Sequence, residues 1–506
     1  MPPGQACTRG YETMCLIAPH THAATPPMSS ATLLLEKILC DVPRRYRLPH
    51  DVAASGIAVR HANPATALAL VVEQVREATA HGATPDPTLK PLFIDALAAM
   101  IAEAIRADSG DRAYQAMVLR HRAPQVREFA ALSAQADQDR RQIHAAVNAI
   151  AHPARQQRAP QAWQREALAL LHSSATSAHR EAHYAGLHHT LQTLLTMPEL
   201  AAKDADFGHA LADLLDSPAL ACLCRLEALT SEALVQQYIS LLDAYGPRPG
   251  TPAAVAQGRA SQRRGAAVEA LAVEALEVLA QRLNAAQENP QAYRVVSSMR
   301  VPASIPGKHE RAKTEWDAVL LERPHAKTPD TAPVWNVRLL VEAKASVESA
   351  TTDLPRLMRG LQLLAHAEEN VVYTFETQQG PVQLNGASLR TQDTEESCLL
   401  KGVLYCCDAP AESTPRMLNA ASRMQLLSAQ ASLEFASAQW DGQRADPEML
   451  DAVWQQLTQS PRWHAVLRQY ATLRLVRELT VHPDDLMATI REATGRSPCT
   501  TYEQTR

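Results

Sequence analysis

The sequence predicts a multidomain α+β protein, with a mostly helical N-terminal region, a core of element order αβββαβ and a helical C-terminal region. The first indication is length, since 506 residues exceed what one hydrophobic core usually supports. The second is composition: hydrophobic residues make up 46% of the chain and aromatic residues only 4%, which favours helices over β-sandwiches. The third is a change of pattern after residue 261, where one helical stretch is followed by several strand-like runs.

Composition and periodicity divide the chain into five regions. Residues 1–27 mix proline, glycine, histidine and threonine without periodicity, which predicts a disordered segment. Amphipathic stretches such as LKPLFIDALAAMIAEAIRA and SEALVQQYISLLDAY predict an all-helical domain over residues 28–245. The stretch GPRPGTPAAVAQGRAS, residues 246–261, is dense in proline, glycine and small residues and predicts a linker. The mixed core follows over 262–410, and helical patterns return over 411–506.

Within the core, the elements follow from alternation and turn signals. The pattern predicts a helix over 262–284, strands over 292–302, 313–323 and 334–346, a helix over 351–369, and strands over 370–377 and 401–408. Between the second and third strands, ERPHAKTPDTAP is rich in proline and polar residues and predicts a long hairpin loop.

The third strand, VWNVRLLVEAKAS, ends with two opposite charges. A period of two residues places an apolar set on one face: Trp335, Val337, Leu339, Val341 and Ala343. Glu342 and Lys344 then share the other face. Taken alone, such a pair is more often an ordinary ion pair at a surface than a functional site.

The neighbouring elements add two more carboxylates. Asp317 stands directly before the apolar run AVLL of the second strand, where an ionised carboxylate is costly unless it is paired or binds a cation. Antiparallel pairing of the second and third strands would bring Asp317 close to Glu342. On the preceding helix, Glu269 lies at the edge of the apolar face, whereas Glu274 and Glu277 point away from it. An ordinary boundary glutamate is an equally good interpretation of Glu269.

Glu269, Asp317, and Glu342 with Lys344, in this order on a helix and two strands, resemble the PD-(D/E)XK nuclease superfamily over about residues 258–410. The resemblance implies a restriction-endonuclease-like core and a magnesium-dependent or manganese-dependent nuclease. It further implies that Asp317, Glu342 and the Ala343 carbonyl bind the metal, with Glu269 as an accessory ligand. Lys344 would position or activate water, so Asp317, Glu342 and Lys344 are the predicted catalytic residues. Trp316 stands where the superfamily has its eponymous proline.

This chemistry suits the residue types. Hydrolysis of a negatively charged phosphodiester needs a cation that neutralises developing charge, and hard oxygen ligands select Mg²⁺ or Mn²⁺. Between residues 259 and 313, nine Lys or Arg face five Glu, a net charge of +4 in a chain of net charge -5. A local basic strip of this kind predicts contact with nucleic acid, most simply DNA. The predicted contact residues are Arg264, Lys308, Arg311, Lys313, Arg356 and Arg359, with Gln362 in an accessory role; for the residues after 351, a solvated helix face is the competing interpretation.

Other functions find less support in the sequence. It contains no GxxxxGK or GxGxxG phosphate loop and no GxSxG elbow. His179 and His183 lack the glutamate that a zinc protease places after the first histidine, so a polar helix face explains them better. Nine scattered cysteines and the lack of a long apolar span predict a cytoplasmic protein without membrane contact. The main rival to a nuclease is an inactive nucleic-acid-binding or protein-assembly module of the same fold, with a protein partner or a second copy bound through the N-terminal helices.

Overall fold

The computed structural model describes residues 29–48, 62–247, 250–324, 333–392, 394–412 and 415–493. The segment 1–27, predicted to be disordered, and residues 325–332 of the predicted hairpin loop lie outside these ranges. The described residues confirm a mixed α+β protein that is predominantly helical.

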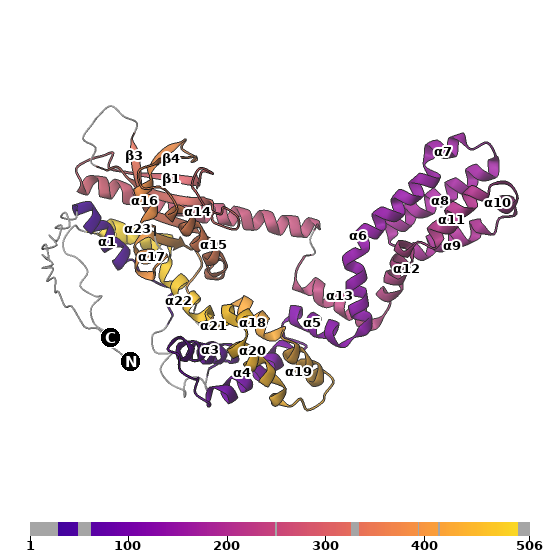
Figure 1. The fold of residues 1–506 in the computed structure, drawn as a ribbon, viewed down its shortest axis with the longest axis horizontal. Coiled ribbons are helices and arrows are strands. Elements are labelled where there is room, and N and C mark those ends of the chain that lie inside the picture. Colours follow the sequence, from indigo (N-terminus) through magenta and orange to yellow (C-terminus); the bar gives the residue numbers. More distant parts are fainter. Residues whose placement is uncertain are drawn as a thin grey trace, which may run out of the picture.

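The described elements are numbered in chain order as in Figure 1. The helices are α1 (Ser30–Asp41), α3 (Pro64–Ala80), α4 (Leu89–Ala104), α5 (Arg112–Arg122), α6 (Pro124–Ala151), α7 (Pro153–Arg158), α8 (Ala162–Glu181), α9 (Tyr184–Leu195), α10 (Pro198–Lys203), α11 (Ala205–Leu215), α12 (Pro218–Thr230), α13 (Ala233–Tyr245), α14 (Pro252–Ala286), α15 (Val347–Ala365), α16 (Gly386–Arg390), α17 (Glu396–Gly402), α18 (Ala420–Leu427), α19 (Gln430–Trp440), α20 (Asp451–Gln459), α21 (His464–Leu467), α22 (Gln469–Leu479) and α23 (Pro483–Glu492), with the 3-10 helices η2 (Pro447–Leu450) and η3 (Pro461–Trp463). The strands are β1 (Tyr293–Arg300), β2 (Glu315–Glu322), β3 (Val334–Ala343), β4 (Val372–Phe375), β5 (Val382–Asn385), β6 (Val403–Cys406) and β7 (Thr480–Val481).

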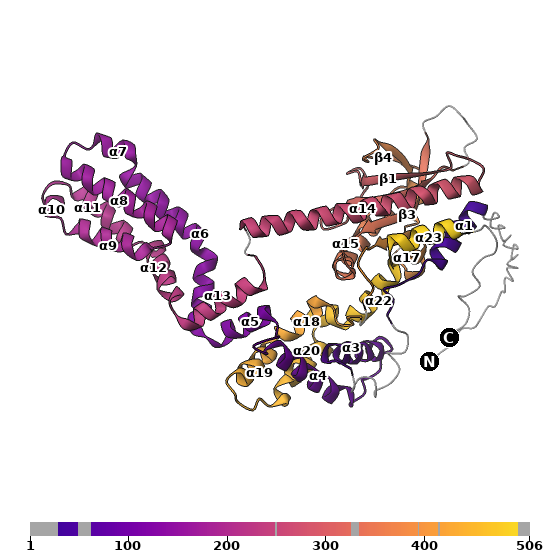
Figure 2. The same cartoon turned by 180° about the vertical axis from the view of Figure 1, so that it is seen from behind.

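Three regions make up the molecule (Figures 1 and 2). The α/β region contains the sheet with α1, α14 to α17, α22 and α23. The helical lobe lies beside it and consists of α3, α4 and α18 to α21. The arm, α6 to α12, extends away from both. Helices α5 and α13 pack against each other where the lobe meets the arm, through a small cluster of buried side chains that includes Leu119 and Val235.

The sheet is built around β3. Strand β2 pairs antiparallel with both β1 and β3, and β3 pairs in parallel with β5 near its start and with β6 near its end. Strand β4 extends the sheet beyond β5, and β7 extends it beyond β6. The helix before β1 and the order β1, β2, β3, α15, β4 match the predicted succession. The sequence analysis did not predict β5, α16, α17 or β7, which are all short.

Helices cover both faces of this sheet. One face packs against α1, α14 and α23, with Leu320, Leu339 and Val341 contributed by the strands. The other face packs against α15, α16, α17 and α22, and there the central strands contribute Val319 and Leu340. Because β3 is covered on both sides, its apolar residues run nearly without interruption.

A β-bulge in β3 corrects the predicted face assignment. Leu320 is opposite Leu339, but Leu321 is opposite Val337, so Arg338 is an extra residue in β3. An extra residue reverses the alternation of side chains along a strand. Trp335 and Val337 therefore face α15, whereas Leu339 and Val341 face α14. The prediction that all four share one face was wrong.

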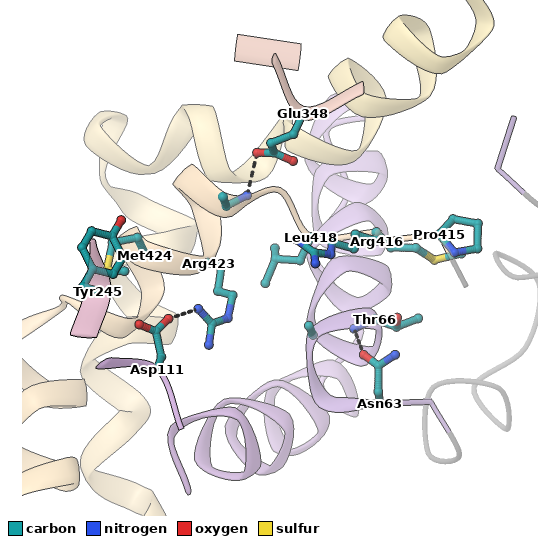
Figure 3. A pocket seen from close by; sticks show the side chains of 13 residues that line it. Asn63, Thr66, Asp111, Tyr245, Glu348, Pro415, Arg416, Leu418, Arg423 and Met424 are labelled. Carbon is teal, nitrogen blue, oxygen red and sulfur yellow. Dashed lines mark hydrogen bonds and ion pairs between the residues drawn. The ribbon is translucent and has the colours of Figure 1, made fainter. Parts of the chain in front are cut away.

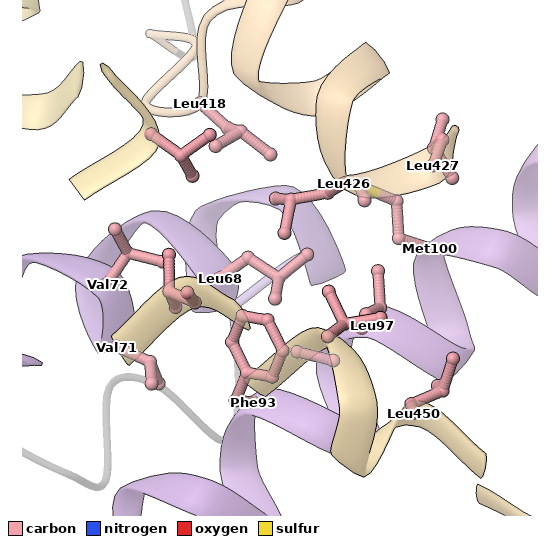
Figure 4. Close-up of a cluster of buried hydrophobic side chains, with 14 of the residues drawn as sticks. Leu68, Val71, Val72, Phe93, Leu97, Met100, Leu418, Leu426, Leu427 and Leu450 are labelled. Carbon is pink, nitrogen blue, oxygen red and sulfur yellow. The ribbon is translucent and has the colours of Figure 1, made fainter. Parts of the chain in front are cut away.

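Two distant parts of the sequence form the helical lobe (Figure 4). Leu68, Phe93 and Leu97 of α3 and α4 pack against Leu426 of α18 and Leu450 of η2. The stretch 28–245 is therefore not one domain: it supplies α1 to the α/β region, α3 and α4 to the lobe, and α6 to α12 to the arm. The C-terminal stretch is likewise shared, because α22, β7 and α23 belong to the α/β region.

Helix α14 begins inside the predicted linker. The side chain of Thr251 accepts a hydrogen bond from the Ala254 N–H, and Pro252 occupies the first helical turn, where a missing N–H is harmless. Residues 252–261 are thus helical, and only the preceding residues remain a connection. The first half of α14 projects beyond the sheet toward the arm (Figure 2), and most of its residues up to Ala267 are exposed.

Among the described residues, no helix combines the length and apolar character needed to cross a bilayer.

Candidate active site

Two neighbouring strands bring the central residues together. Ala318 of β2 is opposite Val341 of β3, so the next residues outward along the pair, Asp317 and Glu342, follow each other in register. Glu342 lies on the sheet face covered by α15, because Leu340, two residues earlier, packs there while Val341 packs on the opposite face. The carboxylate of Asp317 accepts a hydrogen bond of 2.9 Å from the Ala343 N–H. The predicted proximity of the two strand ends is therefore present.

Lys344 is fixed between a strand and a helix. Its N–H donates to the Cys406 carbonyl at 2.9 Å, which continues the pairing of β3 with β6. Two residues later, Ser346 caps α15 by accepting a hydrogen bond from the Ser349 N–H at 3.1 Å. These constraints hold the Lys344 side chain over Glu342, and its Nζ donates to Glu342 Oε2 at 3.0 Å.

Glu342 is completely buried and carries an unusual set of partners. Its Oε2 atom accepts from Lys344 and also from the ammonium of Lys313, which lies in turn 3.8 Å from Asp317 Oδ1. Its Oε1 atom is buried and has no hydrogen-bond partner in the described part of the chain. A buried carboxylate oxygen without a partner is costly, and its presence calls for a functional explanation.

The electrostatics of the site follow from burial and from crowded carboxylates. Burial, and then the charge of Asp317, raise the pKa of Glu342 to about 7, although Lys313 and Lys344 oppose the shift. For Lys344, burial alone would lower the pKa, but Glu342, Asp353 and Asp317 together raise it. Lys344 therefore stays charged, while Glu342 is poised near neutral pH.

Two partners of Lys344 escaped the sequence analysis. Asp353 of α15 places Oδ2 3.5 Å from the Lys344 Nζ, and the Tyr405 hydroxyl donates to the same oxygen at 3.4 Å. Tyr405 is fully buried on β6 opposite Glu342, and burial followed by the Asp353 charge raises its hydroxyl pKa. The signal in the sequence was weak: Tyr405 is the polar-tipped residue of a short apolar strand, and Asp353 looks like an ordinary helix residue.

The position of Lys313 differs from the one that the sequence predicted. It was expected to contact nucleic acid, but its side chain is only 5% exposed and points to Glu342. Its N–H donates to the Arg356 carbonyl of α15 at 3.1 Å, which pulls the loop before β2 onto that helix. Gly360 leaves room for this approach, since a Cβ there would lie 2.6 Å from the Lys313 Cβ. In this structure Lys313 therefore faces the carboxylates of Glu342 and Asp317 rather than the surface, where a nucleic-acid backbone would lie.

Glu269 lies at the margin of the site. It is half-buried on α14, and burial followed by the charge of Asp317 raises its pKa. It lines a pocket of about 630 Å³ between α14 and the turn after β4, which carries Gln378 and Gln379. Glu274 and Glu277 are exposed, as the helical pattern predicted. No described hydrogen bond joins Glu269 to the other carboxylates, so its role as a ligand stays a prediction.

The remaining residues predicted to contact nucleic acid, together with Gln362, are exposed: Arg264, Lys308, Arg311, Arg356, Arg359 and Gln362. Arg264 donates to the Ala345 carbonyl at 3.2 Å, one residue beyond Lys344. Arg359 donates to the Arg311 carbonyl at 2.8 Å and so links α15 to the loop before β2.

The site offers oxygen donors to a divalent cation. No group of three or more His, Cys, Asp or Glu side chains arranged to hold a metal occurs in the described ranges. Mg²⁺, however, usually takes one or two carboxylates with water and substrate oxygens, and Asp317 with the unpartnered Glu342 Oε1 supplies hard oxygen donors of that kind. Around them, the ammonium groups of Lys313 and Lys344 face the carboxylates of Glu269, Asp317, Glu342 and Asp353, a net charge of −2 when all are ionised. A divalent cation would balance that charge, so the donor set fits one.

A second pocket, of about 500 Å³, lies at the junction of the α/β region and the helical lobe (Figure 3). There Glu348 of α15 accepts a hydrogen bond from the Ala420 N–H of α18 at 3.1 Å, and Arg423 pairs with Asp111. The Glu348 bond joins the α/β region to the lobe, whereas the Arg423–Asp111 pair joins α18 to the start of α5, so these charged groups already have partners.

No protein-family model, curated protein or solved structure matches this chain. The assignment of a function therefore depends on the geometry and chemistry of the site.

Proposed function

We propose that this chain is a metal-dependent nuclease that hydrolyses phosphodiester bonds, with DNA as the favoured substrate. The observation that carries the proposal is the meeting of Asp317, Glu342 and Lys344 at the adjoining ends of β2 and β3. A helix, three antiparallel strands and a second helix surround these residues in the order found in the PD-(D/E)XK superfamily. Buried Trp316 stands in place of the superfamily's proline, which has no chemical role.

The residues divide the chemical tasks between them. Asp317, Glu342 and the Ala343 carbonyl would hold Mg²⁺ or Mn²⁺, which supplies charge neutralisation at the phosphate and a lowered pKa for coordinated water. Lys344, held charged by its carboxylate neighbours, would orient the attacking water and compensate the negative charge of the substrate. Asp353 and Tyr405 limit the positions that the Lys344 ammonium can take.

An exposed basic surface beside the site supports a nucleic-acid substrate. Arg259, Arg263 and Arg264 lie on the projecting half of α14, which contains no Asp or Glu between its first residue and Glu269. Arg264 lies 3.6 Å from Asp408 Oδ1, but this half of α14 holds no carboxylate of its own beside Arg259 and Arg263, and an exposed basic helix face of this kind is suited to contact a polyanion. Arg264 bonds to the Ala345 carbonyl, so the end of this exposed half that is nearest the sheet lies directly beside Lys344.

The test is plasmid cleavage by the purified full-length chain with Mg²⁺ or Mn²⁺. The parent should nick or linearise DNA, and a chelator should stop it. Asp317→Asn and Lys344→Ala should each lower the rate on the order of 100-fold or more, the usual range for a group that takes part in the chemistry. Glu166→Gln, an exposed carboxylate in the arm, is the matched control and should keep the parental rate. Parental rates in both site variants would disprove the proposal.

One observation favours the alternative, a binding or assembly module of the same fold. Lys313 already neutralises part of the carboxylate pair, as a purely structural charge cluster would require. In that case Mn²⁺ or Mg²⁺ would not raise the melting temperature, whereas a ligand that binds only the folded state must raise it. Nucleic-acid binding without cleavage and without a metal-induced shift would establish the alternative.

A further inference from the structure

Lys313 is a buried lysine in a site that already contains Lys344. It comes from the loop before β2, and its ammonium contacts the oxygens of both Glu342 and Asp317. Lys344, by contrast, divides its contacts between Glu342 and Asp353. Of the two lysines, Lys313 therefore lies between the two carboxylates that the proposed function assigns to a metal.

The surrounding structure is built to hold Lys313 in this position. Its N–H bonds to the Arg356 carbonyl, and Gly360 allows α15 to approach its backbone and Cβ closely. Arg359 anchors the same loop through the Arg311 carbonyl. A lysine that reached the site by chance from an exposed loop would have none of these supports.

We propose that the Lys313 ammonium is a resident counter-ion that occupies the position between Asp317 and Glu342 until a divalent cation displaces it. The inference rests on the proposed metal site. Fully buried Glu342 needs positive charge nearby, and while no metal is bound Lys313 shares that role with Lys344, so Lys313 stabilises the metal-free protein. An ammonium and a divalent ion compete for the same oxygens, so metal binding and the release of Lys313 are coupled events.

The geometry also leaves one carboxylate oxygen available for the exchange. Glu342 Oε1 has no partner among the described residues, so an arriving ion can engage it while Lys313 still bonds to Oε2. After the exchange Lys344 keeps its contact with Asp353, so the two lysines separate into different roles. The flexible stem of Lys313 then leaves the carboxylate pair, and its ammonium becomes accessible.

The first experiment measures thermal unfolding of the full-length chain across a Mn²⁺ titration. Lys313→Met should melt at a lower temperature than the parent in chelator, because Glu342 loses one of its two cationic partners and Asp317 loses the nearby ammonium. Mn²⁺ should raise the melting temperature of this variant more than that of the parent. The apparent dissociation constant for Mn²⁺ should be roughly tenfold or more below the parent's, because a competing charge is gone. Lys308→Met, an exposed lysine of the same loop, is the control and should behave like the parent.

A second experiment needs no variant. Amine-reactive labelling of the parent, read by mass spectrometry, should modify Lys313 faster with Mn²⁺ than with chelator, while Lys308 is modified equally in both. If Mn²⁺ stabilises the parent but Lys313 labelling does not increase, or Lys313→Met gains no more than the parent, the displacement is disproved and the metal site survives. If Mn²⁺ stabilises neither protein and DNA is not cleaved, the proposed function fails and this inference fails with it.

Discussion

The α/β region buries a cluster of charged side chains, whereas the arm keeps its ion pairs on the surface. In the arm, ion pairs such as Arg225 with Glu128, at 2.7 Å, lie on the surface, with both side chains more than 40% exposed. The arm core consists of alanine, leucine and other apolar residues, and Asp139 is the single charged residue of the described arm that counts as buried. In the α/β region, Lys313 and Glu342 are buried together directly beside Lys344 and Asp317.

This contrast supports the proposed location of the active site. Helix packing in the arm needs no buried charge, and its surface pairs contribute little to stability. Burying a lysine and a glutamate is no efficient way to stabilise a fold, because desolvation offsets most of the attraction between them. A charge cluster kept in the interior despite this cost is typical of a functional site, which supports the proposal that the site lies in the α/β region.

The largest expected effect comes from comparing the loss of a buried ion pair in the α/β region with the loss of an exposed ion pair in the arm. Glu342→Ala leaves the Lys313 ammonium buried without its main partner and should destabilise the α/β region by about 3–5 kcal/mol. Arg225→Ala removes an exposed pair of similar geometry from the arm and should leave unfolding unchanged within error. Chemical denaturation followed by circular dichroism in chelator measures both. Equal effects of the two substitutions would remove the distinction between the regions.

A smaller effect concerns pH. The pKa of Glu342 is raised from 4.5 to about 7 by burial and by Asp317, so the folded state binds this proton more tightly than the unfolded state does. Stability contributed by this proton is present below pH 4.5 and is lost as the pH rises to about 7, an effect of about 3 kcal/mol at most. Glu342→Gln removes the titration, so the parent should lose stability relative to this variant between pH 5 and pH 7. A constant difference across that window would contradict the prediction.

The α/β region also shows how far the sequence could be interpreted. Strands β1 to β3 and the two flanking helices were predictable because apolar alternation and turn residues are local signals. The proximity of Asp317 and Glu342 was predictable because each carboxylate adjoins the apolar run of a strand and the two strands were expected to pair. The bulge at Arg338 was not predictable, since it arises from pairing between β2 and β3 and leaves no mark in the alternation of β3 alone.

Long-range packing explains the other misses. Lys313 looked like a member of a basic strip, and only the approach of α15 through Gly360 buries it. Asp353 and Tyr405 acquire their roles by meeting over Lys344 from α15 and β6. The lobe joins helices from the two ends of the chain, so no local pattern could have separated α3 and α4 from the arm.

The smallest expected effect concerns the basic surface on α14. The test distinguishes a surface that binds nucleic acid from exposed arginines without a binding role. Arg259 and Arg263 are one turn apart on the projecting half of α14, and both are exposed. Arg259→Glu with Arg263→Glu should weaken binding of a labelled DNA duplex, measured by anisotropy in chelator, on the order of tenfold, and should lower the salt dependence by about two phosphate contacts. Arg155→Glu with Arg158→Glu makes the same charge change on exposed α7 at the far end of the arm and should alter neither quantity. If the two double variants bind DNA equally well, the nucleic-acid surface lies elsewhere, because equal changes of net charge would then have equal effects wherever they are placed.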